Sequence, residues 1–193
     1  MITGYTYSFP SIVNQLVIDC AITLPNAATG GVVQNIRALW DTGAQLTCIS
    51  QSLVARLNLQ PDGSTNILGA NNQVFPANVY SVQLIMGRFV IPYLRVAELP
   101  MQNTGHDVII GMDVMSQGDL TITNFNGHTV LTFREPSLET VNYVDEIDLF
   151  NKCLNAHNVR VKHNIRQDKC ECGSGKSFSN CHGKSKYNRP YSK

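Results

Sequence analysis

The sequence predicts a mainly β protein body followed by a C-terminal segment of different chemistry. Runs rich in Val, Ile, Thr and aromatic residues are separated by Gly, Pro and Asn, which is typical of short strands joined by tight turns. The first 135 residues contain 5 Arg, no Lys and 8 acidic residues, whereas residues 136–193 contain 10 basic and 6 acidic residues. So abrupt a change in charge indicates a boundary near residue 135. The strand-length runs cover residues 17–22, 32–39, 79–85, 89–96 and 120–133.

The body shows few helix signals. Residues 50–59 form its one short amphipathic pattern. Pro61-Asp62-Gly63 and Asn126-Gly127 are turn signals. A body of about 130 residues is large enough for a single hydrophobic core.

The most informative segment is Ala38–Ser50, in which the triplet Asp41-Thr42-Gly43 stands between apolar residues. An aspartate at the end of a buried strand, followed by a glycine that permits a tight turn, is the layout of an aspartic protease. This chemistry needs two carboxylates that share one proton, so that one acts as a base toward water and the other as an acid. The triplet occurs once, so an active site needs a second copy of the chain. A bare Asp-Thr-Gly is also typical of a surface turn, but the apolar run that follows favours a buried loop. We expect the loop to be anchored in the core by Leu39, Trp40, Leu46 and Ile49.

Two further segments carry a family resemblance. His106–Met115 predicts a buried strand that ends at Gly111, where glycine permits close backbone approach. Asn66–Phe75 predicts a hairpin with its tip between Gly69 and Asn72. With the Asp41 loop seventy residues before Gly111, these segments resemble the retropepsins, the single-domain dimeric relatives of pepsin. The resemblance covers residues 10–134, and residues 113–122 resemble the short helix and final strands of cellular and bacterial members.

The resemblance implies a closed β-barrel of the acid-protease type with one or two short helices. It also implies a homodimer in which the two Asp41 carboxylates activate a water and no cofactor takes part in catalysis. Thr42 would brace the two active-site loops, and Gly43 would complete the turn. Gly69 and Ala70 in the flap would cover an extended peptide or protein substrate.

One position departs from the pepsin-like pattern, and one triplet imitates it. Ala44 has no hydroxyl where pepsin-like sites often have Ser or Thr, so we expect the carboxylate pair to keep its proton toward neutral pH. Asn103-Thr104-Gly105 mimics a second catalytic triplet, but it runs directly into the Val-Ile-Ile-Gly strand. We therefore expect a connecting loop there.

A connector joins the two parts of the chain. Residues 138–156 carry apolar side chains at helical spacing, and Ser137 is a candidate N-cap. We expect an amphipathic helix that packs on the protease body or on its dimer mate; the alternative is a partly ordered linker. The predicted domains are residues 1–135 (protease), 136–168 (helical connector), 169–184 (zinc knuckle) and 185–193 (basic tail).

The C-terminal segment predicts a structural metal site. Cysteine thiolates and a neutral imidazole are the ligands that tetrahedral zinc prefers, and residues 170–182 supply four such groups around a Gly-Ser-Gly turn. A disulfide pair or a phosphate-binding loop fits this spacing less well. The segment resembles the SEC-C motif, a zinc knuckle of bacterial proteins. The resemblance implies that Zn²⁺ is bound by Cys170, Cys172, Cys181 and His182.

The knuckle lies in a basic stretch, since residues 151–193 contain 10 basic and 2 acidic residues. This charge favours a nucleic-acid partner or an acidic protein surface, or else belongs to a solvated tail.

Residues 1–10 lack the pattern of a signal peptide, and no run approaches transmembrane length, so we expect a cytoplasmic protein of bacterial or phage origin. The sequence thus predicts a homodimeric aspartic endopeptidase with a zinc knuckle for target recruitment. The alternative is an inactive dimer of the same fold that serves as a zinc-dependent protein- or nucleic-acid-binding adaptor.

Overall fold

The computed structural model describes residues 2–25, 32–69, 72–102, 104–162 and 173–177 of the 193-residue chain. The chain divides into two compact units, residues 1–139 and residues 140–193. In chain order the elements are β1 (Thr3–Ser8), β2 (Leu16–Thr23), β3 (Gln34–Trp40), β4 (Cys48–Ser50), α1 (Gln51–Leu57), β5 (Gly63–Leu68), β6 (Val74–Met86), β7 (Phe89–Leu99), β8 (Val108–Ile110), α2 (Met112–Met115), β9 (Asp119–Thr123), a 3₁₀ turn (Phe125–Gly127), β10 (Val130–Glu135) and α3 (Tyr143–Lys162).

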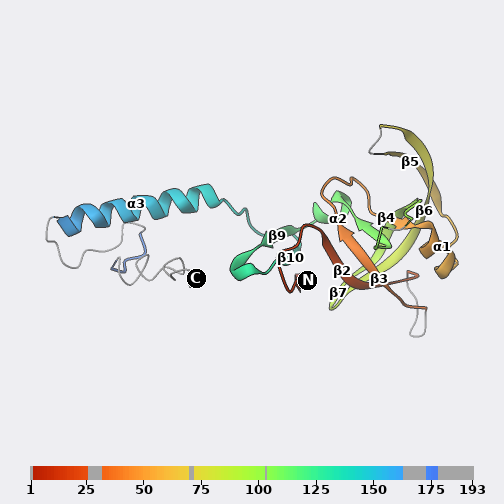
Figure 1. The fold of residues 1–193 in the computed structure, drawn as a ribbon, viewed down its shortest axis with the longest axis horizontal. Coiled ribbons are helices and arrows are strands. Elements are labelled where there is room, and N and C mark those ends of the chain that lie inside the picture. Colours follow the sequence, from red (N-terminus) through yellow and green to blue (C-terminus); the bar gives the residue numbers. More distant parts are fainter. Residues whose placement is uncertain (1, 26–31, 70–71, 103, 163–172, 178–193) are drawn as a thin grey trace. The chain divides into compact units, whose positions relative to one another are not determined.

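Six strands of the first unit close into a barrel. Their order is β2-β3-β8-β4-β7-β6, and β6 pairs back to β2 through the register Ala21↔Ile85. Strand β5 lies outside this ring and pairs with β6 from Gly63↔Val79 to Leu68↔Val74. The β5–β6 hairpin therefore projects from the barrel (Figure 1). The mainly β, closed-barrel fold with few short helices is confirmed.

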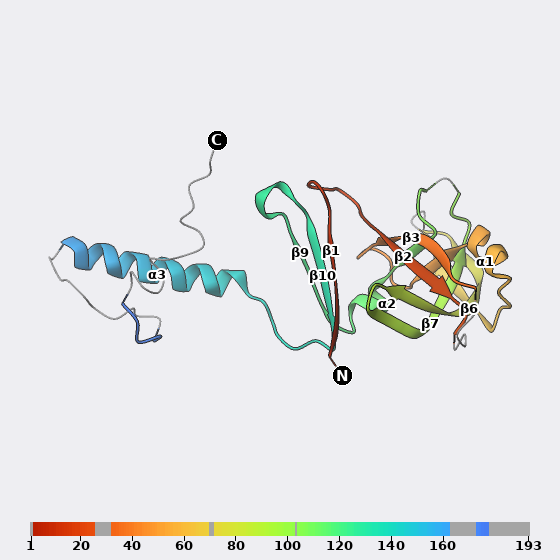
Figure 2. The ribbon, with the colours of Figure 1, turned by 90° about the horizontal axis from the view of Figure 1, so that it is seen from below.

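A second sheet of three strands has the order β1-β10-β9, and its strands lie side by side in Figure 2. One face of this sheet enters the core through Phe133, whose ring centroid lies 5.4 Å from that of Trp40 and 5.5 Å from that of Phe89. All three side chains are buried. Because a buried aromatic residue removes a large apolar area from water, this cluster ties the three-stranded sheet to the barrel.

The predicted strand runs agree with β2, β3 and β7 to within a few residues, whereas β6 begins at Val74, well before its predicted start at residue 79. The run 120–133 is two strands, β9 and β10, separated by the turn at Asn126-Gly127, where φ is 54° and 78°. The strand patterns do not predict β1, because its Thr, Gly and Ser residues weaken the apolar signal.

The short helix expected at residues 50–59 is α1. The hydroxyl of Ser50 accepts a hydrogen bond from the backbone N–H of Leu53 at 3.2 Å, which caps the first turn. The helix ends at Asn58, which is left-handed with φ of 47°. Leu53 and Leu57 are its buried residues, so α1 covers the barrel through one face.

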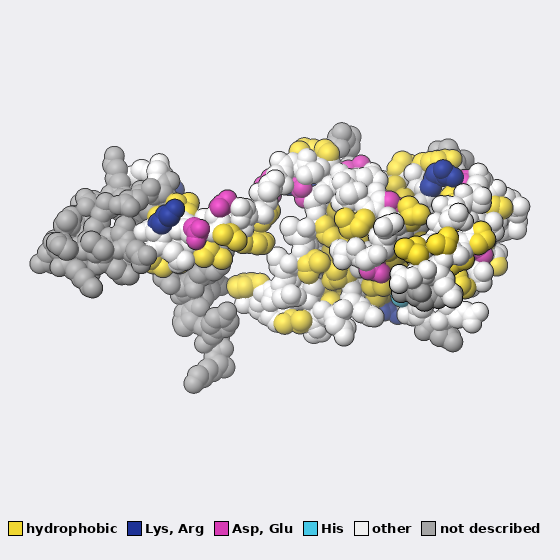
Figure 3. Space-filling model, turned by 90° about the horizontal axis from the view of Figure 1, so that it is seen from above, with side chains coloured by type: hydrophobic (Ala, Val, Ile, Leu, Met, Phe, Trp, Pro, Cys, Tyr) yellow, Lys and Arg dark blue, Asp and Glu magenta, His cyan; other side chains and the backbone are white. Residues whose placement is uncertain are grey.

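The connector helix differs from the expectation at its start. The Ser137 hydroxyl does not cap a helix but donates to the carboxylate of Asp119. Helix α3 begins at Tyr143, and the side-chain oxygen of Asn142 accepts from the N–H groups of Val144 at 3.0 Å and Asp145 at 3.3 Å. Exposed hydrophobic side chains, Val144 and Ile147 among them, alternate with acidic ones along this helix (Figure 3). In the described part of the chain, no helix has the length and apolar composition of a membrane-spanning one.

Candidate active site

Asp41 follows the last residue of β3 and lies in a loop that is fixed by hydrogen bonds to backbone groups. Its N–H donates to the carbonyl of Ile110 at 3.0 Å, which ties it to the end of β8. Its Oδ1 accepts from the N–H of Gly43 at 2.9 Å, and its carbonyl accepts from the N–H of Ala44 at 3.1 Å. A Cβ on Gly43 would lie 3.2 Å from Asp41 Oδ1, so glycine leaves room for this tight turn.

The segment after β8 supports the other side of the loop. Met112 N–H donates to the Ala44 carbonyl at 2.8 Å, and Asp113 N–H donates to the Gln45 carbonyl at 3.1 Å. Gly111 allows this approach, because a Cβ there would lie 2.6 Å from the backbone carbon of Leu46. The predicted close approach at Gly111 is therefore present, and it faces the Asp41 loop.

A buried threonine and an aspartate complete the support, and the sequence patterns do not single out either. Thr47 donates through its backbone N–H to Asp113 Oδ2 at 2.9 Å and through its hydroxyl to Asp113 Oδ1 at 2.7 Å. The same hydroxyl accepts from the N–H of Gly111 at 3.1 Å. Thr47 is fully buried, so each of these polar groups depends on the others for a partner. The available signal was a polar residue inside the apolar run of residues 46–49.

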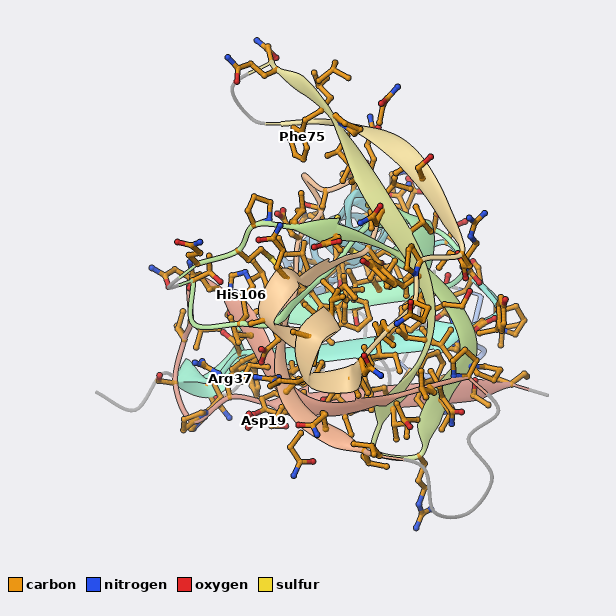
Figure 4. All side chains as sticks on the ribbon, turned by 90° about the vertical axis from the view of Figure 1, so that its right-hand side faces the viewer. Asp19, Arg37, Phe75 and His106 are labelled. Carbon is orange, nitrogen blue, oxygen red and sulfur yellow. The ribbon has the colours of Figure 1, made fainter. Side chains whose placement is uncertain are left out.

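The loop forms the floor of a groove of about 420 Å³. The opposite side of the groove is formed by the β5–β6 hairpin, which is the predicted flap. Its Ile67, Gly69 and Phe75 line the groove, and Phe75 is labelled in Figure 4. Leu46 was expected to be a core anchor, but its side chain is 42% exposed and lines the groove. It is Thr47 that turns inward, because the hydroxyl has polar partners in the core.

The groove is almost uncharged. Among the described residues that line it, Asp41 is the only acidic or basic one. Cys48 also lines it, and burial, with the nearby Asp113 carboxylate, raises the pKa of this thiol to about 11. The thiol donates to the Leu46 carbonyl at 3.4 Å and stays protonated at neutral pH.

The remaining predicted residues are distributed as follows. Asp41, Gly43 and Gly69 line the same groove, whereas Thr42 is exposed and is not among its lining residues. Ala70 lies outside the described residues, as do Cys170, Cys172, Cys181 and His182. In the loop that imitates a second triplet, Thr104 and Gly105 lie between β7 and β8, outside both strands.

Sequence comparison finds a family similarity for the middle of the chain. Residues 26–114, which include the Asp41 loop, the flap and Gly111, match the family model described as "Aspartyl protease". This stretch of the chain is similar to the aspartyl proteases. No curated protein matches the sequence.

Solved structures similar to this protein share little sequence with it. A retropepsin-like aspartic protease from Rickettsia conorii is 11% identical with a TM-score of 0.43, covering 70% of this chain and 96% of its own. The foamy viral protease-reverse transcriptase in complex with an RNA/DNA hybrid is 18% identical with a TM-score of 0.37, covering 80% of this chain and 18% of its own. The retroviral protease-like domain of Ddi1 from Leishmania major is 15% identical with a TM-score of 0.32, covering 64% of this chain and 94% of its own.

Proposed function

We propose that this protein is an aspartic endopeptidase whose active site is built from two copies of the chain. The observation that carries the proposal is the placement of Asp41, a lone carboxylate on the floor of a flap-covered groove. One carboxylate cannot act as both acid and base at once, and the sequence has one Asp-Thr-Gly triplet. A homodimer supplies the second carboxylate.

In the proposed reaction the two Asp41 carboxylates share one proton and hold a water between them. The ionised partner takes a proton from the water as it attacks the scissile carbonyl carbon, and the protonated partner donates to the carbonyl oxygen. Collapse of the tetrahedral intermediate then returns a proton to the leaving amine. The Gly43 N–H bonded to Asp41 Oδ1 holds the carboxylate in place through these steps. Flap residue Gly69, with Ala70, would bind the peptide backbone of an extended substrate.

The C-terminal segment is proposed to bind a structural Zn²⁺ through Cys170, Cys172, Cys181 and His182. The described part of this segment supports the proposal: Gly173 and Gly175 have φ of 80° and 70°, so the Gly-Ser-Gly sequence makes the left-handed turns that a knuckle between two ligand pairs requires. Four protein ligands would leave no open position, so the metal would stabilise the fold and take no part in hydrolysis. The knuckle and the basic residues around it would recruit a protein or nucleic-acid partner.

The catalytic proposal is tested by mixing variants. Asp41→Asn should abolish cleavage of an unfolded protein, while Asp19→Asn, an exposed aspartate on β2, should not. After subunit exchange with an equal amount of Asp41→Asn chains, about a quarter of the dimers would keep both carboxylates. A monomeric enzyme would instead retain about half of its active sites, because each chain would act alone. Cleavage that survives Asp41→Asn would contradict the proposal.

The adaptor alternative has its own outcome. If neither wild type nor variant cleaves any unfolded protein, while the chain dimerises and binds a partner only with zinc present, the adaptor function is supported. Metal content of the purified full chain, measured by mass spectrometry for wild type and Cys172→Ser, tests the zinc site separately. We expect one zinc per chain in wild type and loss of most of it in the variant, with cleavage of an unfolded protein unchanged.

A further inference from the structure

A second pocket lies beside the catalytic groove and shares one wall with it. We call it the flank pocket; it encloses about 370 Å³. Phe75 lines both cavities. At the end of β7, Leu99 lines the groove, whereas Glu98 before it and Pro100 just after the strand line the flank pocket. The described residues lining the flank pocket are Gln51, Ser64, Phe75, Pro76, Ala77, Asn78, Glu98 and Pro100.

Glu98 is the only charged residue in this list, and its carboxylate is held in one orientation. Glu98 Oε2 accepts from the Tyr80 hydroxyl at 2.7 Å and from Asn78 Nδ2 at 3.1 Å. Tyr80 is only 3% exposed, so its hydroxyl cannot turn freely toward water. Burial, together with the bond to Glu98, raises the pKa of Tyr80, so the hydroxyl remains a donor. The geometry fixes a negative charge at the edge of the groove.

No cation neutralises this charge within the described part of the chain. The ion pairs found there join Arg56 to Asp107, Arg95 to Asp62, and Arg134 to Asp119 and Glu139. The larger groove on the outer face of β2 and β3 differs in this respect. Arg37 and Asp19, which are labelled in Figure 4, line it together with Asp107, and Asp107 already has Arg56 at 3.0 Å. The carboxylate of Glu98 is thus an acid placed in a pocket without its own counter-ion.

We propose that the flank pocket binds a Lys or Arg side chain of the peptide substrate, and that Glu98 is a specificity-determining residue for a basic residue near the scissile bond. This inference rests on the proposed peptidase function. The apolar walls, Phe75 and the two prolines, suit the methylene stem of a long basic side chain, while its charged end reaches the carboxylate. The ring of Phe75 can add a cation–π contact. The neutral catalytic groove would meanwhile take the uncharged side chains next to the bond that is cut.

The test compares peptides that differ at one position. In a series of otherwise identical substrates, Lys, norleucine or Glu is placed in turn at each position flanking the cleavage site, and kcat/KM is measured with the full-length dimer. At one position wild type should favour Lys over Glu by about tenfold or more, the range expected for a charge-assisted hydrogen bond. Glu98→Gln, which keeps an acceptor for Tyr80, should reduce the preference to near unity. Glu139→Gln, a matched loss of one exposed carboxylate elsewhere, should leave it unchanged.

Two further experiments distinguish failure of the flank-pocket inference from failure of the peptidase proposal. Gln51→Arg brings a cation into the same pocket without altering Glu98, and should also weaken the preference for Lys. Fluorescent peptides bound to Asp41→Asn report the same preference as an affinity ratio without any cleavage. If wild type cleaves Lys and Glu peptides equally at every position, the inference is overturned while the peptidase proposal stands. If nothing is cleaved but the binding preference depends on Glu98, the pocket is assigned correctly and the peptidase proposal fails.

Discussion

The hydroxyl of Thr47 donates to the Asp113 carboxylate at 2.7 Å, and this bond joins the Asp41 loop to the segment after β8 across 66 positions of sequence. The backbone N–H of Thr47 bonds to the other carboxylate oxygen at 2.9 Å. Asp113 thereby fixes the far end of the loop that begins at Asp41. Neither residue is among those that line the groove, so both would affect the proposed reaction through the position of that loop.

Replacing Thr47 with Val should weaken both stability and activity. The change keeps the shape of the side chain but removes the donor to Asp113 and the acceptor for the Gly111 N–H, which leaves buried polar groups without partners. We expect a loss of about 2–3 kcal/mol in the free energy of unfolding, measured by urea denaturation. We also expect kcat to fall more than KM rises, because the catalytic carboxylate is displaced.

Thr47→Ser is the matched control for this change, since it keeps the hydroxyl and loses one methyl group. It should retain most of the activity. Equal activity losses in the Val and Ser variants would show that the methyl group, and not the hydrogen-bond network, positions the loop.

Gly111→Ala should disturb the same loop from the opposite side. A Cβ at this position would meet the backbone carbon of Leu46 at 2.6 Å and its oxygen at 2.7 Å, and backbone atoms cannot move aside as a flexible side chain does. We expect a destabilisation of about 1–3 kcal/mol together with a large loss of kcat. Thermal unfolding and peptide cleavage by the same preparation would measure the two effects.

Gly63→Ala provides the comparison, because the Cβ there would meet the end of the flexible Arg95 side chain at 2.9 Å. Arg95 can move, so this variant should fold and cleave nearly as wild type does. Full activity in Gly111→Ala would mean that the active-site loop does not depend on its close contact with Gly111.

The sequence predicts those parts of the site whose signal is local. Asp41 with Gly43, the strand ending at Gly111 and the flap near Gly69 all carry a turn or strand pattern, and the structure places them around one groove. The pairing of Thr47 with Asp113 has no such signal, because it depends on which distant strands become neighbours. Leu46 was misplaced for a related reason, since hydrophobicity alone cannot tell which residue of a loop turns inward.

The same limit applies to the start of α3. Ser137 has the residue type of an N-cap, but Asp119 offers its hydroxyl a stronger partner, a carboxylate that also accepts from the N–H of Leu138 at 2.8 Å. Asn142, further along the chain, caps the helix instead. A local pattern identifies candidates for a cap, whereas the long-range contact decides between them.

Asp119 should make the stability of the protease body sensitive to acid. The hydrogen bonds from Ser137, the Leu138 N–H and Arg134 hold the pKa of this carboxyl well below its usual range. Because the folded-state pKa is lowered, the ionised form stabilises the fold above the ordinary aspartate pKa of 3.8, and this contribution is lost as pH falls toward the lower folded-state value. Asp119→Asn should therefore lower the urea midpoint at pH 7 and lower it less at pH 3.

Asp62→Asn is a suitable comparison, because Asp62 also accepts from a serine, Ser81, and faces an arginine, Arg95 at 3.7 Å. In the described part of the chain, Asp62 accepts from these side chains, whereas Asp119 also accepts from the backbone N–H of Leu138. Its effect on the urea midpoint should be smaller. An Asp119→Asn protein as stable as wild type at both pH values would show that this carboxylate network contributes nothing to the fold.

Ala44 should set the upper end of the pH range in which the proposed dyad works. Its backbone is fixed on both sides, since its N–H donates to the Asp41 carbonyl at 3.1 Å and its carbonyl accepts from Met112 at 2.8 Å. Ala44 lines the same groove as Asp41, so a hydroxyl added there shares that groove with the carboxylate. In Ala44→Ser the new hydroxyl can donate to the ionised Asp41 carboxylate, and a bond to the charged form lowers the pKa at which the pair loses its shared proton. The alkaline limb of the kcat/KM profile should then move to lower pH by roughly half to one unit. Ala44→Gly, which adds no donor, should leave that limb in place, and a shift of the Ser variant toward higher pH would contradict the assignment of the shared proton to Asp41.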